Sequence, residues 1–155
     1  MVRPTGQRKA VDSPGPRALA SSASTCAAQG PARSAIVEIV NRRDSAPFVT
    51  KDGSEIRSIL DRTNSTASNQ SLAEATLPPG AATAPHRHPA TEEIYYVLRG
   101  AGRMTVGMEQ RGVGPGDGIL IPPGTRHTME NIGAEPLVFL CCCAPPYAHE
   151  DTVLE

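Results

Sequence analysis

The chain has 155 residues, enough for one domain and a tail, and its formal net charge is -1. Such a nearly neutral chain lacks the positive field that attracts nucleic acid or acidic lipid. It has no apolar run near the ~20 residues of a membrane span, and no apolar stretch follows its basic N-terminal residues as a secretory signal requires. We therefore expect a cytoplasmic protein that binds neither nucleic acid nor membrane.

Residues 1–34 have the composition of a segment without a core. They are rich in Ala, Ser, Pro, Gly and Arg, contain Asp12 as their one acidic residue, and have no aromatic side chain. Such a stretch buries too little apolar surface to offset the entropy lost on ordering. We predict a disordered N-terminal tail. An organelle transit peptide and an over-long start site both stay open as interpretations of the same composition.

Residues 35–155 have a different pattern and are predicted to form one all-β domain. All five aromatic residues lie here, and short apolar runs alternate with Gly/Pro turns. No segment shows sustained helical periodicity. The expected strands cover residues 36–40, 55–60, 72–77, 93–98, 102–106, 110–113, 119–121, 127–131 and 137–143. Short antiparallel strands of this kind commonly close into a barrel or a jelly roll, which limits exposed sheet edges.

The four cysteines do not form an obvious disulfide framework. Cys141, Cys142 and Cys143 are consecutive, and Cys26 lies in the predicted tail. They also make a poor zinc site, because consecutive residues of a strand point to opposite faces. We interpret the three as small apolar residues of a late strand. A redox role stays open, as does an inward position for one of them.

Three of the four histidines, together with one glutamate, are spaced as ligands of a metal ion. His86 and His88 are separated by one residue, so in a strand both imidazoles point to the same face. Glu93 opens the next predicted strand, and His127 follows a Pro-Pro-Gly turn and begins another. Imidazoles with a carboxylate suit one divalent transition metal: Fe, Mn, Ni, Cu, Co or Zn. The neighbouring Glu92 competes with Glu93 as the carboxylate ligand.

These residues lie within two motifs that resemble those of the cupin family. The first motif runs through Gly80, His86-Arg87-His88, Glu93 and Gly100, and the second through Gly116, Pro122-Pro123-Gly124, His127 and Asn131. The resemblance implies a small single-domain cupin, in which residues 35–155 form a jelly-roll β-barrel. It also implies that His86, His88, Glu93 and His127 hold the metal inside the barrel. The spacing to Gly100 favours Glu93 over Glu92.

Tyr95 is the candidate catalytic residue. If Glu93 points inward, alternation along the strand turns Tyr95 inward as well and Tyr96 outward. Its phenol could then orient a substrate or transfer a proton. A purely structural tyrosine, held by an interior hydrogen bond, explains the same pattern equally well.

The resemblance says more about the fold than about the reaction, since one fold hosts many chemistries. We place first a dioxygenase-type oxidoreductase that acts on a small molecule. A metal-assisted isomerase, cyclase or lyase, similar to sugar-phosphate isomerases or polyketide cyclases, is the first alternative. A non-enzymatic binder of a small ligand is the second. We also expect a homodimer, because Ile94, Tyr96 and Leu98 would form an outward apolar row that needs cover.

Overall fold

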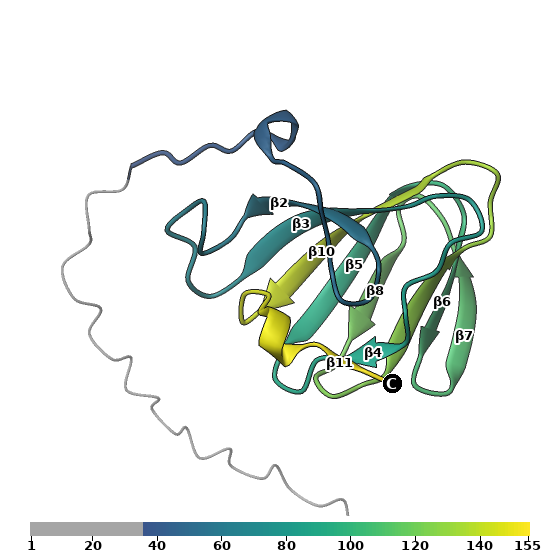
Figure 1. Ribbon diagram of the computed structural model, residues 1–155. Helices are drawn as coiled ribbons and strands as arrows, with labels where there is room; N and C mark the ends of the chain where they lie inside the picture. Colours follow the sequence, from purple (N-terminus) through teal and green to yellow (C-terminus); the bar gives the residue numbers. More distant parts are fainter. Residues whose placement is uncertain (1–35) are drawn as a thin grey trace, which may run out of the picture. The chain divides into compact units, whose positions relative to one another are not determined.

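The computed structural model describes residues 36–155 (Figure 1). The tail predicted over residues 1–34, with Cys26, lies outside the described residues. Within them the predicted all-β class is confirmed, and the only helical segments are the short 3-10 turns η1 (Arg42–Asp44) and η2 (His149–Asp151). Neither of these helical turns has the length and apolar character needed to cross a membrane.

The strands form two antiparallel sheets. One sheet has the order β1-β2-β3-β10-β5-β8, and the other has the order β11-β4-β9-β6-β7. The strands of the first sheet are β1 (Phe48–Val49), β2 (Glu55–Leu60), β3 (Ser71–Leu77), β10 (Leu137–Ala144), β5 (Glu92–Arg99) and β8 (Gly118–Ile121). The strands of the second are β11 (Val153–Leu154), β4 (His86–Arg87), β9 (His127–Asn131), β6 (Gly102–Val106) and β7 (Glu109–Val113).

The predicted alternation along β5 is confirmed. This strand lies between β10 and β8, so its backbone is paired on both sides and its side chains alternate strictly. Glu93, Tyr95 and Val97 are buried, with at most 4% of their surface exposed. The intervening Ile94 and Tyr96 are each 44% exposed. The parity of β5 thus directs one carboxylate and one phenol into the interior.

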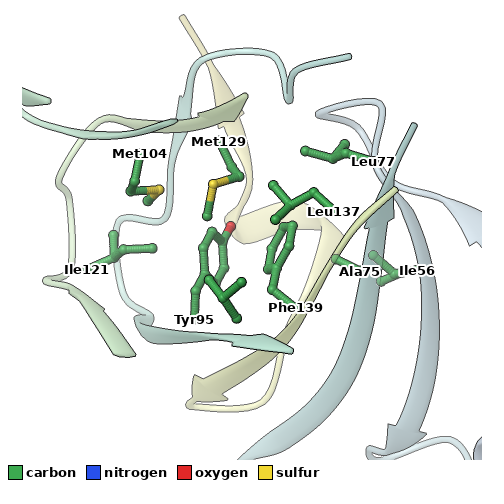
Figure 2. Close-up of a cluster of buried hydrophobic side chains, with 10 residues drawn as sticks. Ile56, Ala75, Leu77, Tyr95, Met104, Ile121, Met129, Leu137 and Phe139 are labelled. Atoms are coloured by element: carbon green, nitrogen blue, oxygen red, sulfur yellow. The ribbon is translucent and has the colours of Figure 1, made fainter. Parts of the chain in front are cut away.

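Apolar side chains from both sheets form the core between them (Figure 2). The first sheet contributes most of these side chains, and β6 and β9 of the second contribute Met104 and Met129. Met129 has no exposed surface and packs in this core. The apolar core fills one end of the interior, and polar side chains line the other end.

The motif glycines shape the turns that carry the candidate ligands. Gly100 adopts φ +90, and a Cβ there would lie 2.8 Å from the Leu137 backbone, so both conformation and space require glycine. Gly124 adopts φ +74, and its N–H donates a 2.7 Å hydrogen bond to the His88 carbonyl. The Pro-Pro-Gly turn is therefore tied directly to the segment of the first motif.

The predicted strand over residues 36–40 is wrong. Ile36, Val37 and Ile39 are each more than 80% exposed, and no strand pairs with them among residues 36–155. An apolar run becomes a strand only when a neighbour takes up its backbone hydrogen bonds. The sequence analysis also missed the two-residue strands β1 and β11, which are too short to have a periodic pattern.

Candidate metal centre

The four predicted ligand residues come together in the interior. His86 lies in β4 and pairs in register with His127, the first residue of β9. His88 follows β4, and Glu93 reaches the same point from β5 in the opposite sheet. All four side chains are buried, and one potential ligand atom from each lies within 4.8 Å of the others. The site is thus built from both sheets at once.

Each histidine is oriented by a hydrogen bond through its outer ring nitrogen. His86 Nδ1 donates to the Ala84 carbonyl at 2.8 Å, and His127 Nδ1 donates to the Thr125 carbonyl at 3.0 Å. His88 Nδ1 faces the Asp151 carbonyl at 3.3 Å. A carbonyl only accepts, so the proton sits on Nδ1 and each Nε2 is left with its lone pair. Partners of this type fix the tautomer and raise the basicity of metal-bound imidazoles.

Burial favours the neutral form of His86. Its pKa is lowered by burial and by the neighbouring His127, against the opposing effect of its hydrogen bond to Ala84. A neutral imidazole is the form that binds a metal ion.

The Glu93 carboxylate completes the group. Its Oε2 lies 3.5 Å from His88 Nε2 and 3.4 Å from His127 Nε2. Glu93 Oε2 and His127 Nε2 are both buried, and neither has a hydrogen-bond partner within residues 36–155. Two ligands about 2.1 Å from one metal ion are separated by about 3.0–3.4 Å in octahedral or tetrahedral geometry, close to these distances. Burying a polar atom without a partner costs free energy, and a bound divalent metal ion would be a partner for both atoms. The residues present therefore fit such an ion.

Three of the four residues, His86, His88 and Glu93, line a small inner cavity of about 50 Å³. Its lining residues, together called the inner cavity below, are Phe48, Thr50, Asp52, Ser54, Ile56, Ser58, Asp61, Ser71, Ala73, His86, His88, Glu93, Tyr95, Cys141, Cys143, Tyr147 and Thr152. The predicted catalytic residue Tyr95 is among them. The fourth histidine, His149, is exposed and lies outside the cluster.

Tyr95 is buried beside the cluster, with 3% of its surface exposed. Its ring stands edge-on to the His127 ring at a centroid distance of 6.1 Å and packs on Phe139 at 4.7 Å. Figure 2 shows the ring directed into the apolar core. Burial, followed by the charge of Glu93, raises its pKa well above that of a free tyrosine.

The segment between β1 and β2 contributes a second carboxylate that the sequence analysis missed. Thr50, Asp52 and Ser54 are all buried, while Lys51 and Gly53 between them are exposed. Asp52 accepts hydrogen bonds from the Thr50 hydroxyl and, at 3.0 Å, from the Ser54 hydroxyl. Because Lys51 is polar as well, no alternation in the sequence marked these positions. The segment places a fixed carboxylate in the inner cavity besides Glu93.

The segment after β10 also reaches the site, although the sequence analysis assigned it no role there. The Asp151 carboxylate accepts hydrogen bonds from the Ala90 and Thr91 N–H groups, each at 3.1 Å, and from the Thr91 hydroxyl at 2.7 Å. Strand β11 then pairs with β4 beside His86. These contacts place the Asp151 carbonyl against His88.

Two of the three consecutive cysteines face the inner cavity. Cys141 and Cys143 line it, as expected from alternation, and Cys143 Sγ donates a hydrogen bond to Glu93 Oε1 at 3.3 Å. Burial, then the Glu93 charge, raises the pKa of the Cys143 thiol far above its usual range, so it stays a protonated donor. The inward position left open in the sequence analysis is therefore taken by two thiols.

Comparison with known proteins links this arrangement to a family. A model described as a cupin domain matches residues 73–143. An uncharacterized protein of Methanocaldococcus jannaschii is 53% identical over 106 residues, which cover 68% of this chain and 85% of that protein.

Solved structures show the same fold. The crystal structure of a predicted oxalate decarboxylase from Thermotoga maritima is 25% identical, covers 70% of this chain and 99% of its own, and has a TM-score of 0.62. The polyketide cyclase RemF from Streptomyces resistomycificus is 26% identical, covers 70% and 80% of the two chains, and also has a TM-score of 0.62.

Proposed function

Because this chain belongs to the cupin family, we propose that it is a metal-dependent enzyme acting on a small molecule, with His86, His88, Glu93 and His127 as the metal ligands. The observation that carries the proposal is the pair of buried, partnerless atoms, Glu93 Oε2 and His127 Nε2, within a cluster of four potential ligands. A divalent metal bound there would act as a Lewis acid on a carbonyl or carboxylate oxygen.

Among the reaction classes left open above, we place metal-assisted cyclase, isomerase or lyase chemistry first. Two groups in the inner cavity can hold or move a proton beside a bound substrate: the Asp52 carboxylate and the Tyr95 hydroxyl. The similarity to proteins described as a predicted oxalate decarboxylase and a polyketide cyclase favours the same class. The dioxygenase that the sequence analysis placed first stays a prediction.

The test begins with elemental analysis of the full chain purified without added metal. About one equivalent of a divalent transition metal, lost in the His127→Ala variant, supports the metal site. The loaded protein is then screened with small hydroxy acids, keto acids and β-dicarbonyl compounds, with and without dioxygen. Turnover without dioxygen supports the proposed class. Strict dependence on dioxygen would establish the oxidoreductase instead, and no turnover with any metal would favour a ligand-binding protein.

A further inference from the structure

The inner cavity adjoins a larger outer groove. The outer groove has a volume of about 470 Å³, and its lining residues are Val40, Asp44, Ser45, Ala46, Phe48, Ser58, Asp61, Arg62, Thr63, Asn64 and Tyr147. Phe48, Ser58, Asp61 and Tyr147 line both hollows. These shared residues therefore form the boundary between the site of the four candidate ligands and the outer groove.

The two hollows differ in the size of group they accept. One water needs about 10–15 Å³ of such volume, so the 50 Å³ inner cavity holds only a few heavy atoms. The outer groove, at 470 Å³, lies within the range of about 300–1,000 Å³ that is common for small-molecule sites. A ligand that occupies both the inner cavity and the outer groove would have a small reactive end and a larger body.

Aromatic side chains lie where the body would pass. Phe48 is 45% exposed, and the Tyr147 ring stands edge-on to the His88 ring at 6.2 Å. The Tyr147 hydroxyl is buried and forms no hydrogen bond with the part of the chain that the structure describes. An apolar body between these rings would cover Phe48, and an oxygen on the ligand would supply the hydrogen bond that Tyr147 lacks.

The charges of the two hollows disfavour a dianion. Asp52 is 7% exposed and adds a carboxylate to the inner cavity beyond Glu93. Asp61 lies at the boundary; its burial raises its pKa, but hydrogen bonds from Ser58, Thr63 and Asn64 outweigh this effect and leave the pKa lowered. In the outer groove, the single Arg62 guanidinium lies among two carboxylates, those of Asp44 and Asp61. Two carboxylates near a divalent ion already balance its charge, so a dianion would add uncompensated negative charge.

We infer that the ligand of this site is a neutral or singly charged oxygen chelator attached to an apolar body about the size of an aromatic ring. A free dicarboxylate such as oxalate does not fit this description. The inference rests on the proposed metal site. The chelating end occupies the inner cavity, and the body passes between Phe48 and Tyr147 into the outer groove. Asp52 sets the charge that the site accepts, and Phe48 sets the preference for an apolar body.

Three chelators test the inference on the full chain loaded with Co(II), whose visible absorption reports ligand binding. Acetohydroxamate fills the inner cavity alone, benzohydroxamate adds a phenyl ring, and oxalate is a dianion. We expect benzohydroxamate to bind about tenfold more tightly than acetohydroxamate, after correction for binding to free Co(II), because only its ring reaches the outer groove. Equal affinities for the two hydroxamates would overturn the inference, as would oxalate binding more tightly than both.

Two variants separate the size and charge arguments. Phe48→Ala should remove most of the preference for benzohydroxamate, whereas Val49→Ala, an exposed neighbour that lines neither hollow, should retain it. Asp52→Asn should raise oxalate affinity about tenfold relative to acetohydroxamate. An unchanged preference in Phe48→Ala would overturn the assigned path of the body. Failure of the wild-type chain to bind Co(II) would instead overturn the metal site, and this inference with it.

Discussion

Cys143 and Glu93 are joined by a hydrogen bond inside the barrel, with 3.3 Å between Sγ and Oε1. The thiol occupies one carboxylate oxygen and leaves Oε2 to face the histidines. Cys143→Ala should therefore weaken metal binding about 10-fold or more, the usual effect of losing a partner of a metal ligand. Cys143→Ser keeps a donor and should lose less, as competition with a chromogenic chelator would show. Equal affinities in Cys143→Ala and wild type would mean that the thiol does not orient Glu93.

Single substitutions of the four candidate ligands test the metal site itself. His86→Ala, His88→Ala and His127→Ala should each remove most of the bound metal, because each deletes one donor atom. Glu93→Gln should weaken binding by removing the anionic donor. His149→Ala is the matched control, since this histidine is exposed and lies outside the cluster. Tight binding of one metal equivalent by a variant lacking His86, His88 and His127 would refute the assignment.

Removing the metal should lower the thermal stability of the protein. Without a metal ion, Glu93 Oε2 and His127 Nε2 stay buried and unpaired. A ligand present at 100 times its dissociation constant stabilises a protein by about 2.7 kcal/mol. For a domain of this size, this free energy corresponds to a change in Tm of roughly 5–15 °C. Calorimetry with and without a chelator would measure the change, and the His127→Ala variant should show none.

Tyr95→Phe tests the catalytic role proposed for the phenol. The substitution keeps the ring and its packing on Phe139, so metal content should be unchanged and the free energy of unfolding should stay within about 1 kcal/mol of wild type. Turnover should fall about 100-fold or more if the hydroxyl transfers or holds a proton. Tyr96→Phe, on the exposed face of β5, is the control. Full activity in Tyr95→Phe would leave Asp52 as the acid–base candidate.

Assembly is predicted from the outer face of the first sheet. Ile94, Tyr96 and Leu98 are each more than 40% exposed, and Leu120 of β8 pairs in register with Ile94. An apolar surface of this kind favours a homodimer. Sedimentation at micromolar concentration should show a dimer that Ile94→Asp dissociates. Met108→Asp, in an exposed turn, should leave the dimer intact. A monomeric wild-type chain would contradict the prediction.

The sequence predicted those parts of the fold that repeat a short pattern. Strict alternation placed Glu93 and Tyr95 on one face of β5. This strand is paired on both sides, so its side chains can point only to one face of the sheet or to the other. The spacing of the two motifs brought three histidines to the same point. Ile36 failed as part of a strand because apolar character alone does not supply a neighbouring strand.

Other parts of the site depend on contacts between distant segments. Asp52 and Tyr147 reach the inner cavity from positions 95 residues apart in sequence, and no local pattern relates one to the other. The hydrogen bond from Cys143 to Glu93 depends on the register between β10 and β5, which pairs these two residues. Register of this kind is set by the packed sheet, so sequence alone left the direction of the cysteines open.

The segment over residues 148–154 has a kinetic consequence for the site. It is held by β11 at the edge of its sheet, by Asp151 bonded to Thr91, and by Lys51 Nζ, which donates to the His149 carbonyl at 2.7 Å. Few of these contacts belong to the apolar core, so this segment can open by local unfolding while the two sheets stay packed. Opening would release the Asp151 carbonyl from His88 and admit solvent to the ligands. The exchange rate of a bound metal would then follow the opening rate of this segment, and not the far slower global unfolding of the domain.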